Sequence, residues 1–210
     1  GGEQFDPEGL AACQGAADEL DHISRERVGA EMLRMLALPR VATTLALMDR
    51  LGLVRLAPGA VPALQRYEAL GGQSAAARLA MLGRDDLAQR QADWRLSKAL
   101  VGHAERIAES SALLRRGDVG WAAYRFGEDA VEGLAVAAAE EGWPREQLAE
   151  LARDMGRLPV APLPVGGADL EARGMKPGPD MGAALAIMER AWVESEFSAS
   201  KDALLERIFH

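Results

Sequence analysis

Apolar residues recur along this chain at helical rather than strand spacing. Ser24 is a residue type that favours the start of a helix, and an apolar stripe follows it. The stripe consists of Val28, Met32, Met35 and Leu36. Runs of β-branched residues, which mark strands, are nearly absent, and the nearest candidate, residues 158–165, is a proline-rich linker. We therefore expect an all-α fold, an elongated multi-helix array, with no sheet of three or more strands.

Capping residues, prolines and glycines divide this pattern into segments. Asp6-Pro7 predicts the first helix start, Pro39 ends the second helix, and Gly52 stops the third. The expected helices cover about residues 7–20, 24–39, 41–51, 61–70, 74–82, 87–116, 119–125, 127–141, 144–155, 168–173, 179–194 and 200–208.

The longest expected helix, residues 87–116, has two distinct faces. One face is apolar and contains Leu96, Leu100, Ala104, Ile107 and Leu114. The opposite face carries Arg95, Lys98, Glu105, Arg106 and Glu109. We expect the charged face to be turned to solvent or to a charged partner.

Composition narrows the class of protein. Apolar residues make up 49% of the 210 residues and aromatic residues only 5%, so small aliphatic side chains must fill the core. No stretch approaches the roughly 20 apolar residues of a membrane span, and no membrane partner is expected. The lone Cys13 cannot form an internal disulfide, which agrees with a cytoplasmic location. Because the chain opens with Gly1 in mid-pattern, we interpret it as a portion of a longer protein.

Charge is unevenly distributed. The net charge of −8 argues against a strong general nucleic-acid binder, and DNA is not an expected partner. Residues 78–125 nevertheless carry nine basic and six acidic side chains. Any electrostatic attraction for RNA is therefore expected in this basic stretch.

The sequence contains no complete catalytic or metal site. Its three histidines are scattered without ligand spacing, and there is no phosphate-binding loop. Gly71-Gly72-Gln73-Ser74 followed by Asp85-Asp86 faintly resembles a nucleotidyltransferase signature. The chemistry of that signature needs two carboxylates on the same side of a strand to hold two metal ions. Here the two aspartates are adjacent, so their side chains point to opposite sides. We interpret this acidic pair, like Glu128-Asp129 and Glu140-Glu141, as solvated.

Three segments, in order, resemble the C-terminal half of the class II tRNA nucleotidyltransferases, the bacterial CCA-adding enzymes grouped with poly(A) polymerases. The first reads Ile23-Ser24-Arg25-Glu26-Arg27-Val28-Gly29-Ala30-Glu31-Met32-Leu33, similar to the neck motif S-x-E-R-(I/V)-x-x-E-(L/M). The second is Trp94-Arg95-Leu96-Ser97-Lys98, with Tyr124-Arg125-Phe126-Gly127 at the family's distance. The third is the tail pattern in Pro164-Val165-Gly166-Gly167-Ala168-Asp169-Leu170, then Gly174, Pro177-Gly178-Pro179-Asp180-Met181-Gly182 and Trp192.

The resemblance implies a division into the remainder of a neck domain at residues 1–58, a body at 59–157 and a tail at 158–210. It implies that a missing N-terminal catalytic head in the same polypeptide uses Mg²⁺ with CTP or ATP. That head would add or repair the 3′-terminal CCA of tRNA, and this chain would grip the tRNA and be inactive alone. No cofactor is expected in the chain itself.

The neck motif also has a simple physical interpretation. Ser24 can cap a helix, Glu26 can favour the same helix end, and Arg27 and Glu31, four residues apart, can pair. These four residues either stiffen the neck or merely form a well-capped helix.

Candidate RNA-binding residues are basic side chains of the body and one tail turn. The basic candidates are Arg95, Lys98, Arg106, Arg115, Arg116 and Arg125, and their alternative is a mixed-charge solvated face. Gly178 and Pro179 open a helix whose N-terminus could hold a phosphate, although Asp180 could satisfy the same helix end.

Two alternative functions stay open at this point. The parent protein could be a poly(A) polymerase rather than a CCA-adding enzyme, because nucleotide choice lies upstream. A helical interaction domain without an RNA role is the other alternative.

Overall fold

In the computed structural model, which describes residues 24–83 and 86–209, every regular element is a helix. The helices are α2 (Arg25–Leu36), α3 (Ala42–Arg50), α4 (Ala60–Ala69), α5 (Ala75–Met81), α6 (Leu87–Asp93), α7 (Lys98–Arg115), α8 (Val119–Phe126), α9 (Glu128–Glu141), α10 (Arg145–Arg157), α11 (Gly167–Ala172), α12 (Pro179–Glu194) and α13 (Lys201–Glu206). The predicted all-α fold is confirmed. The helix predicted at residues 7–20 lies outside the described residues.

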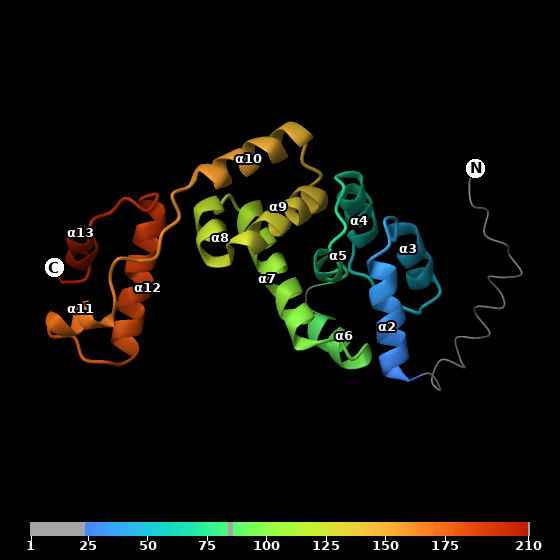
Figure 1. Cartoon of the computed structure of the whole chain (residues 1–210), viewed down its shortest axis with the longest axis horizontal. Helices are drawn as coiled ribbons and strands as arrows, with labels where there is room; N and C mark the ends of the chain where they lie inside the picture. The colour runs from blue at the N-terminus through green and yellow to red at the C-terminus, as the bar shows by residue number, and fades with distance from the viewer. Residues whose placement is uncertain (1–23, 84–85, 210) are drawn as a thin grey trace, which may run out of the picture.

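The helices form an arch (Figure 1). α2 to α6 make up one limb, α7 to α9 cross the middle with α10 above them, and α11 to α13 make up the other limb. Within the described residues, no helix is long and apolar enough to cross a membrane.

Most predicted helix ends agree with the structure to within about two residues. Ser24, Ser74, Ser97 and Ser200 each accept a hydrogen bond from a first-turn N–H. Such caps satisfy one of the backbone donors that the start of a helix leaves free. Pro179 occupies the first turn of α12, as predicted.

The single long helix predicted at residues 87–116 is wrong. The chain leaves the helix between α6 and α7, where Arg95 adopts a left-handed φ of 49°. Trp94 and Leu96 are both buried, at 9% and 6% exposure. Residues two positions apart point to nearly opposite sides of a helix, so a continuous helix would have exposed one of these two side chains.

Three apolar clusters hold the described helices together. The first cluster runs from Met32 to Ala139 and contains residues of every helix from α2 to α7 and of α9. It therefore draws residues from both sides of position 58. The second belongs to the tail and centres on Leu170, Met188 and Trp192, and the third links α7, α8 and α9 with α10. The division into neck, body and tail at residues 58 and 157 stays a prediction.

One close contact between helices α7 and α9 depends on glycine. A Cβ on Gly133 of α9 would lie 1.8 Å from Ser110 Oγ of α7, well inside van der Waals contact. Ser110 and Ser111 are buried at this crossing. Small residues let two helix backbones approach closely, which explains how an alanine-rich, aromatic-poor core is packed.

The tail pattern forms a turn that Asp169 holds. The Gly166 N–H donates to Asp169 Oδ2 at 2.9 Å, and Lys201 Nζ of α13 lies 2.6 Å from Asp169 Oδ1. These hydrogen bonds, first the one from Lys201 and then the one from Gly166, hold the pKa of Asp169 below its usual value. The tail motif therefore has a structural role here.

Candidate nucleic-acid interface

The predicted neck motif begins α2. Ser24 Oγ accepts a hydrogen bond from the Arg27 N–H at 3.3 Å, and Glu26 lies in the first turn. The predicted pair of Arg27 with Glu31 is wrong, because Glu31 pairs instead with Arg34 at 2.5 Å. An acid placed N-terminal to its basic partner is the favoured order on a helix, and Arg27 precedes Glu31.

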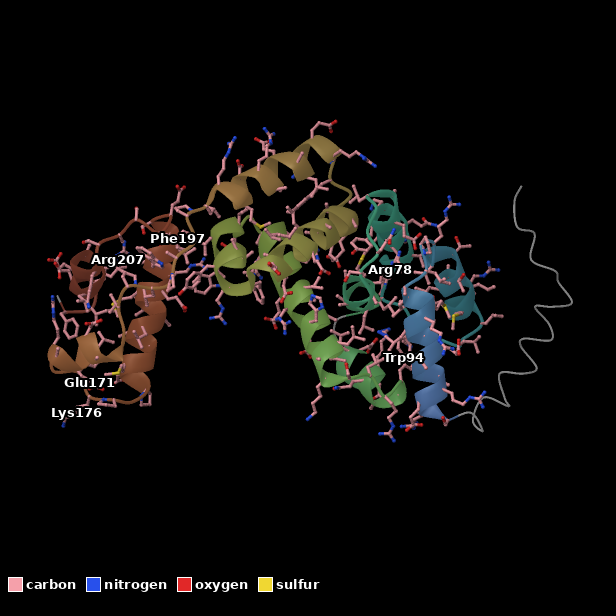
Figure 2. All side chains as sticks on the ribbon, in the orientation of Figure 1. Arg78, Trp94, Glu171, Lys176, Phe197 and Arg207 are labelled. Carbon is pink, nitrogen blue, oxygen red and sulfur yellow. The ribbon has the colours of Figure 1, made fainter. Side chains whose placement is uncertain are left out.

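Gly29 brings this motif against the segment that precedes α7. A Cβ on Gly29 would lie 1.7 Å from the Trp94 carbonyl oxygen, so only glycine fits between α2 and the segment before α7. Figure 2 shows Trp94 beside the ribbon of α2. Nearby, Glu26 Oε1 lies 3.7 Å from Arg95 Nε. We call this contact region, residues 25–29 with 94–98, the neck–body seam.

Arg95 and Lys98 both lie on the neck–body seam. The Arg95 side chain is 58% exposed, and its one ion pair among the described residues is the long contact with Glu26. Lys98, the first residue of α7, is exposed and makes no ion pair within the described part of the chain. Two of the six predicted basic residues are thus available to a ligand at one place.

Arg106 and Arg115 are engaged in holding α7 to α9. Arg106 Nε lies 2.5 Å from Asp129 Oδ2, and Arg115 contacts Glu140 at 3.0 Å and Glu141 at 2.6 Å. The interpretation of these acids as merely solvated was therefore wrong. The sequence could not reveal the pairing, because the partners lie more than twenty positions away.

Arg116 and Arg125 lie toward the other end of the body. Arg116 caps the C-terminus of α7, is exposed, and makes no ion pair among residues 24–83 and 86–209. Arg125 lies 3.9 Å from Glu189 and covers the Trp121 ring at 5.7 Å, while Arg190 lies 5.3 Å from the same ring. Arg125 thus takes part in the junction between α8 and α12.

The predicted basic residues do not form one patch. α7 has 18 residues, so its two ends lie about 27 Å apart at 1.5 Å per residue. Arg95 and Lys98 lie at the first end, whereas Arg115 and Arg116 lie at the last. A ligand that reaches both ends must be as long as several nucleotides.

Two arginines of the basic stretch are buried and cannot meet a ligand. Arg78 is 0% exposed and donates to the carbonyl oxygens of Leu36, Leu38, Pro39 and Gly72. Arg90 is 6% exposed, donates to the carbonyls of Arg55 and Leu82, and lies 5.8 Å from the Trp94 ring centroid. The exposed positive charge is smaller than the sequence count suggests.

Gly178 and Pro179 open α12 at the surface of the tail. Both are exposed, and no side chain caps the helix start. A Cβ on Gly178 would meet nothing within 4 Å, and Asp180 lies in the same first turn. Their role in phosphate binding stays a prediction.

The described residues do not fit a metal centre. Among residues 24–83 and 86–209, no three histidine, cysteine or acidic side chains are grouped so that they could hold a metal ion. Of the adjacent pair Asp85-Asp86, Asp85 lies outside the described residues, and Asp86 at the start of α6 contacts Arg90 at 3.8 Å.

Comparison with known proteins shows which families this chain resembles. Residues 75–208 match the family described as "tRNA nucleotidyltransferase domain 2 putative". Residues 4–64 match the family described as "Probable RNA and SrmB- binding site of polymerase A". No curated protein matches the chain.

One solved structure resembles almost the whole chain. It is the crystal structure of the Bacillus stearothermophilus CCA-adding enzyme in complex with CTP, with 27% sequence identity and a TM-score of 0.73. The likeness covers 96% of this chain and 57% of that enzyme, so this chain spans little more than half of the enzyme's length. Since the first family match covers more than half of the residues, the chain belongs to the tRNA nucleotidyltransferase family.

Proposed function

We propose that this chain is the tRNA-binding part of an enzyme that adds or repairs the 3′-terminal CCA of tRNA from CTP and ATP. The observation that carries the proposal is the likeness of 96% of the chain to a CCA-adding enzyme. The family match of residues 4–64, whose description names RNA, supports the same partner. The chain's share of the work is to hold the tRNA so that its 3′ end reaches the catalytic site.

The catalytic head is proposed to lie in the same polypeptide, outside these residues. The chain spans 57% of the CCA-adding enzyme, which leaves room for such a head. Mg²⁺ with CTP or ATP belongs to the complete enzyme in this proposal. In this proposal the metal-binding carboxylates belong to the head. A cytoplasmic location stays a prediction.

Poly(A) addition is the second candidate activity. The description of the family matched by residues 4–64 names polymerase A, and this match favours it. Both activities require the same grip on RNA and differ in nucleotide choice. The nucleotides that the complete polypeptide incorporates, CTP then ATP or ATP alone, distinguish the two candidates.

The proposal predicts binding without catalysis. When the purified chain is mixed with tRNA that lacks CCA, Mg²⁺, CTP and ATP, we expect a tRNA complex in a gel-shift assay and no lengthening of the tRNA. The physical reason is that gripping needs only cations and shape, whereas nucleotidyl transfer needs two metals held by carboxylates.

Two results would contradict this prediction. Incorporation of labelled CMP or AMP by the chain, purified free of host enzyme, would place the catalytic site within it. The absence of any tRNA complex with a folded chain would favour a helical interaction domain without an RNA role.

A further inference from the structure

The neck–body seam gathers basic side chains from two segments about 70 positions apart. Arg25 lies four residues before Gly29 and therefore on the face of α2 that meets Trp94. Arg95 and Lys98 come from the other side of the seam. All three side chains are exposed, and Arg25 and Lys98 make no ion pair among the described residues. Within residues 24–83 and 86–209, the one acid that forms an ion pair with this group is Glu26, at 3.7 Å from Arg95.

Arg95 stands in a backbone conformation that suits glycine better. Its φ of 49° is left-handed, a region that costs a side-chain-bearing residue free energy and costs glycine none. Burial of Trp94 and Leu96 on either side explains the turn itself. The Arg95 side chain does not take part in that burial, since more than half of it is exposed. Strain of this kind is concentrated at functional sites.

The ion pair between Glu26 and Arg95 is too weak to explain why an arginine stands there. Both side chains are mainly exposed, at 69% and 58%, and the two atoms are 3.7 Å apart. Exposed pairs of this kind contribute little to stability, because water screens the charges. A phosphate could therefore replace the Glu26 carboxylate at small cost.

We propose that Arg25, Arg95 and Lys98 together bind the RNA phosphate backbone across the neck–body seam, with Glu26 as the counter-ion that RNA displaces. This inference rests on the proposed tRNA-binding function and locates one contact of that function. A polyanion suits the site because three exposed cations lie along this seam in a chain whose overall charge is −8, and two of them make no ion pair with any described residue. Because the cations come from both sides, bound RNA would also fasten α2 to α7.

The test uses Arg95→Gly and Glu26→Gln, measured for tRNA affinity by fluorescence anisotropy and for thermal stability. Arg95→Gly removes a cation and relieves the left-handed backbone. We expect an unchanged or higher Tm and an affinity lower by about fivefold, with the salt dependence flatter by about 0.9. Glu26→Gln removes the competing carboxylate, so we expect a higher affinity.

A purely structural role of the ion pair predicts different changes in Tm and in tRNA affinity. If the pair served only to hold α2 to the body, both variants would lower Tm, and neither would change affinity in the stated direction. Glu146→Gln on α10 removes an acid far from the seam and controls for net charge. Its effect on affinity should be smaller than that of Glu26→Gln.

A second pair of variants addresses Arg25 and Lys98, the two seam cations that have no ion pair in the described part of the chain. Arg25→Gln with Lys98→Gln should lower affinity by about tenfold or more and flatten the salt slope by nearly two. The control is Arg153→Gln with Arg157→Gln on α10, at the opposite edge of the arch from the start of α7 (Figure 1). Equal affinity of the two double variants would refute the seam site. Lack of binding by the unaltered chain would instead refute the proposed function.

Discussion

Replacing Arg78 by methionine is expected to lower the free energy of unfolding by about 3–5 kcal/mol. Arg78 is fully buried, and its guanidinium donates to four backbone carbonyls at 2.5 to 3.3 Å. Leu36 is the last residue of α2, and Leu38 and Pro39 belong to the connection between α2 and α3. Methionine fills similar volume but leaves these carbonyls without the guanidinium donors, and it leaves Glu68, 3.9 Å away, without its ion-pair partner.

The measurement for Arg78 is the urea midpoint and slope of the variant. Arg66→Met is the matched control, because Arg66 also donates to two carbonyls, of Ala139 and Glu140, but is exposed. We expect the control to lose only about 1 kcal/mol, since water can replace the arginine. For Arg78→Lys, which keeps the charge but not the guanidinium's several donors, the loss of stability should lie between those two values. Equal losses at both sites would show that burial of Arg78 has no special energetic role.

Gly29→Ala is expected to destabilise the chain by about 2 kcal/mol or more. The added Cβ would lie 1.7 Å from the Trp94 carbonyl oxygen, which is backbone and cannot rotate away. Alanine gains at most about 1 kcal/mol of helix propensity over glycine, so the clash dominates.

A helical glycine in open space gives the control for Gly29. Gly156 lies in α10, and a Cβ there would meet nothing within 4 Å. Gly156→Ala should leave stability unchanged or raise it by up to about 1 kcal/mol. Thermal unfolding of the two variants side by side measures the difference, and a stable Gly29→Ala variant would contradict the seam packing.

The sequence predicted the helices well because their ends are local. Ser24, Ser74 and Ser200 act as caps through hydrogen bonds to residues three positions away. The break at Arg95 could not be predicted in this way. It results from burying Trp94 and Leu96 together, and Trp94 packs against Gly29, which is about 65 positions away in the sequence, as well as against the nearby Arg90.

The candidate site was predictable only in part. Counting charges along the sequence identified Arg95 and Lys98, which are exposed. The same count gave equal weight to Arg78 and Arg90, which are buried. Whether an arginine faces solvent, a carbonyl or an acid on another helix depends on the tertiary fold. Gly29 within the neck motif was the one local signal of the seam, since a glycine inside a helix often marks a close approach.

The salt dependence of tRNA binding by this chain tests the central claim most directly. A fluorescently labelled tRNA lacking CCA is titrated with the chain at several salt concentrations, and the logarithm of the binding constant is plotted against the logarithm of salt. We expect saturable binding with a linear slope of about −2 to −3, because about three phosphate contacts release their counterions. A folded chain that shows no saturable binding at low salt, or binding that is independent of salt, would contradict the account.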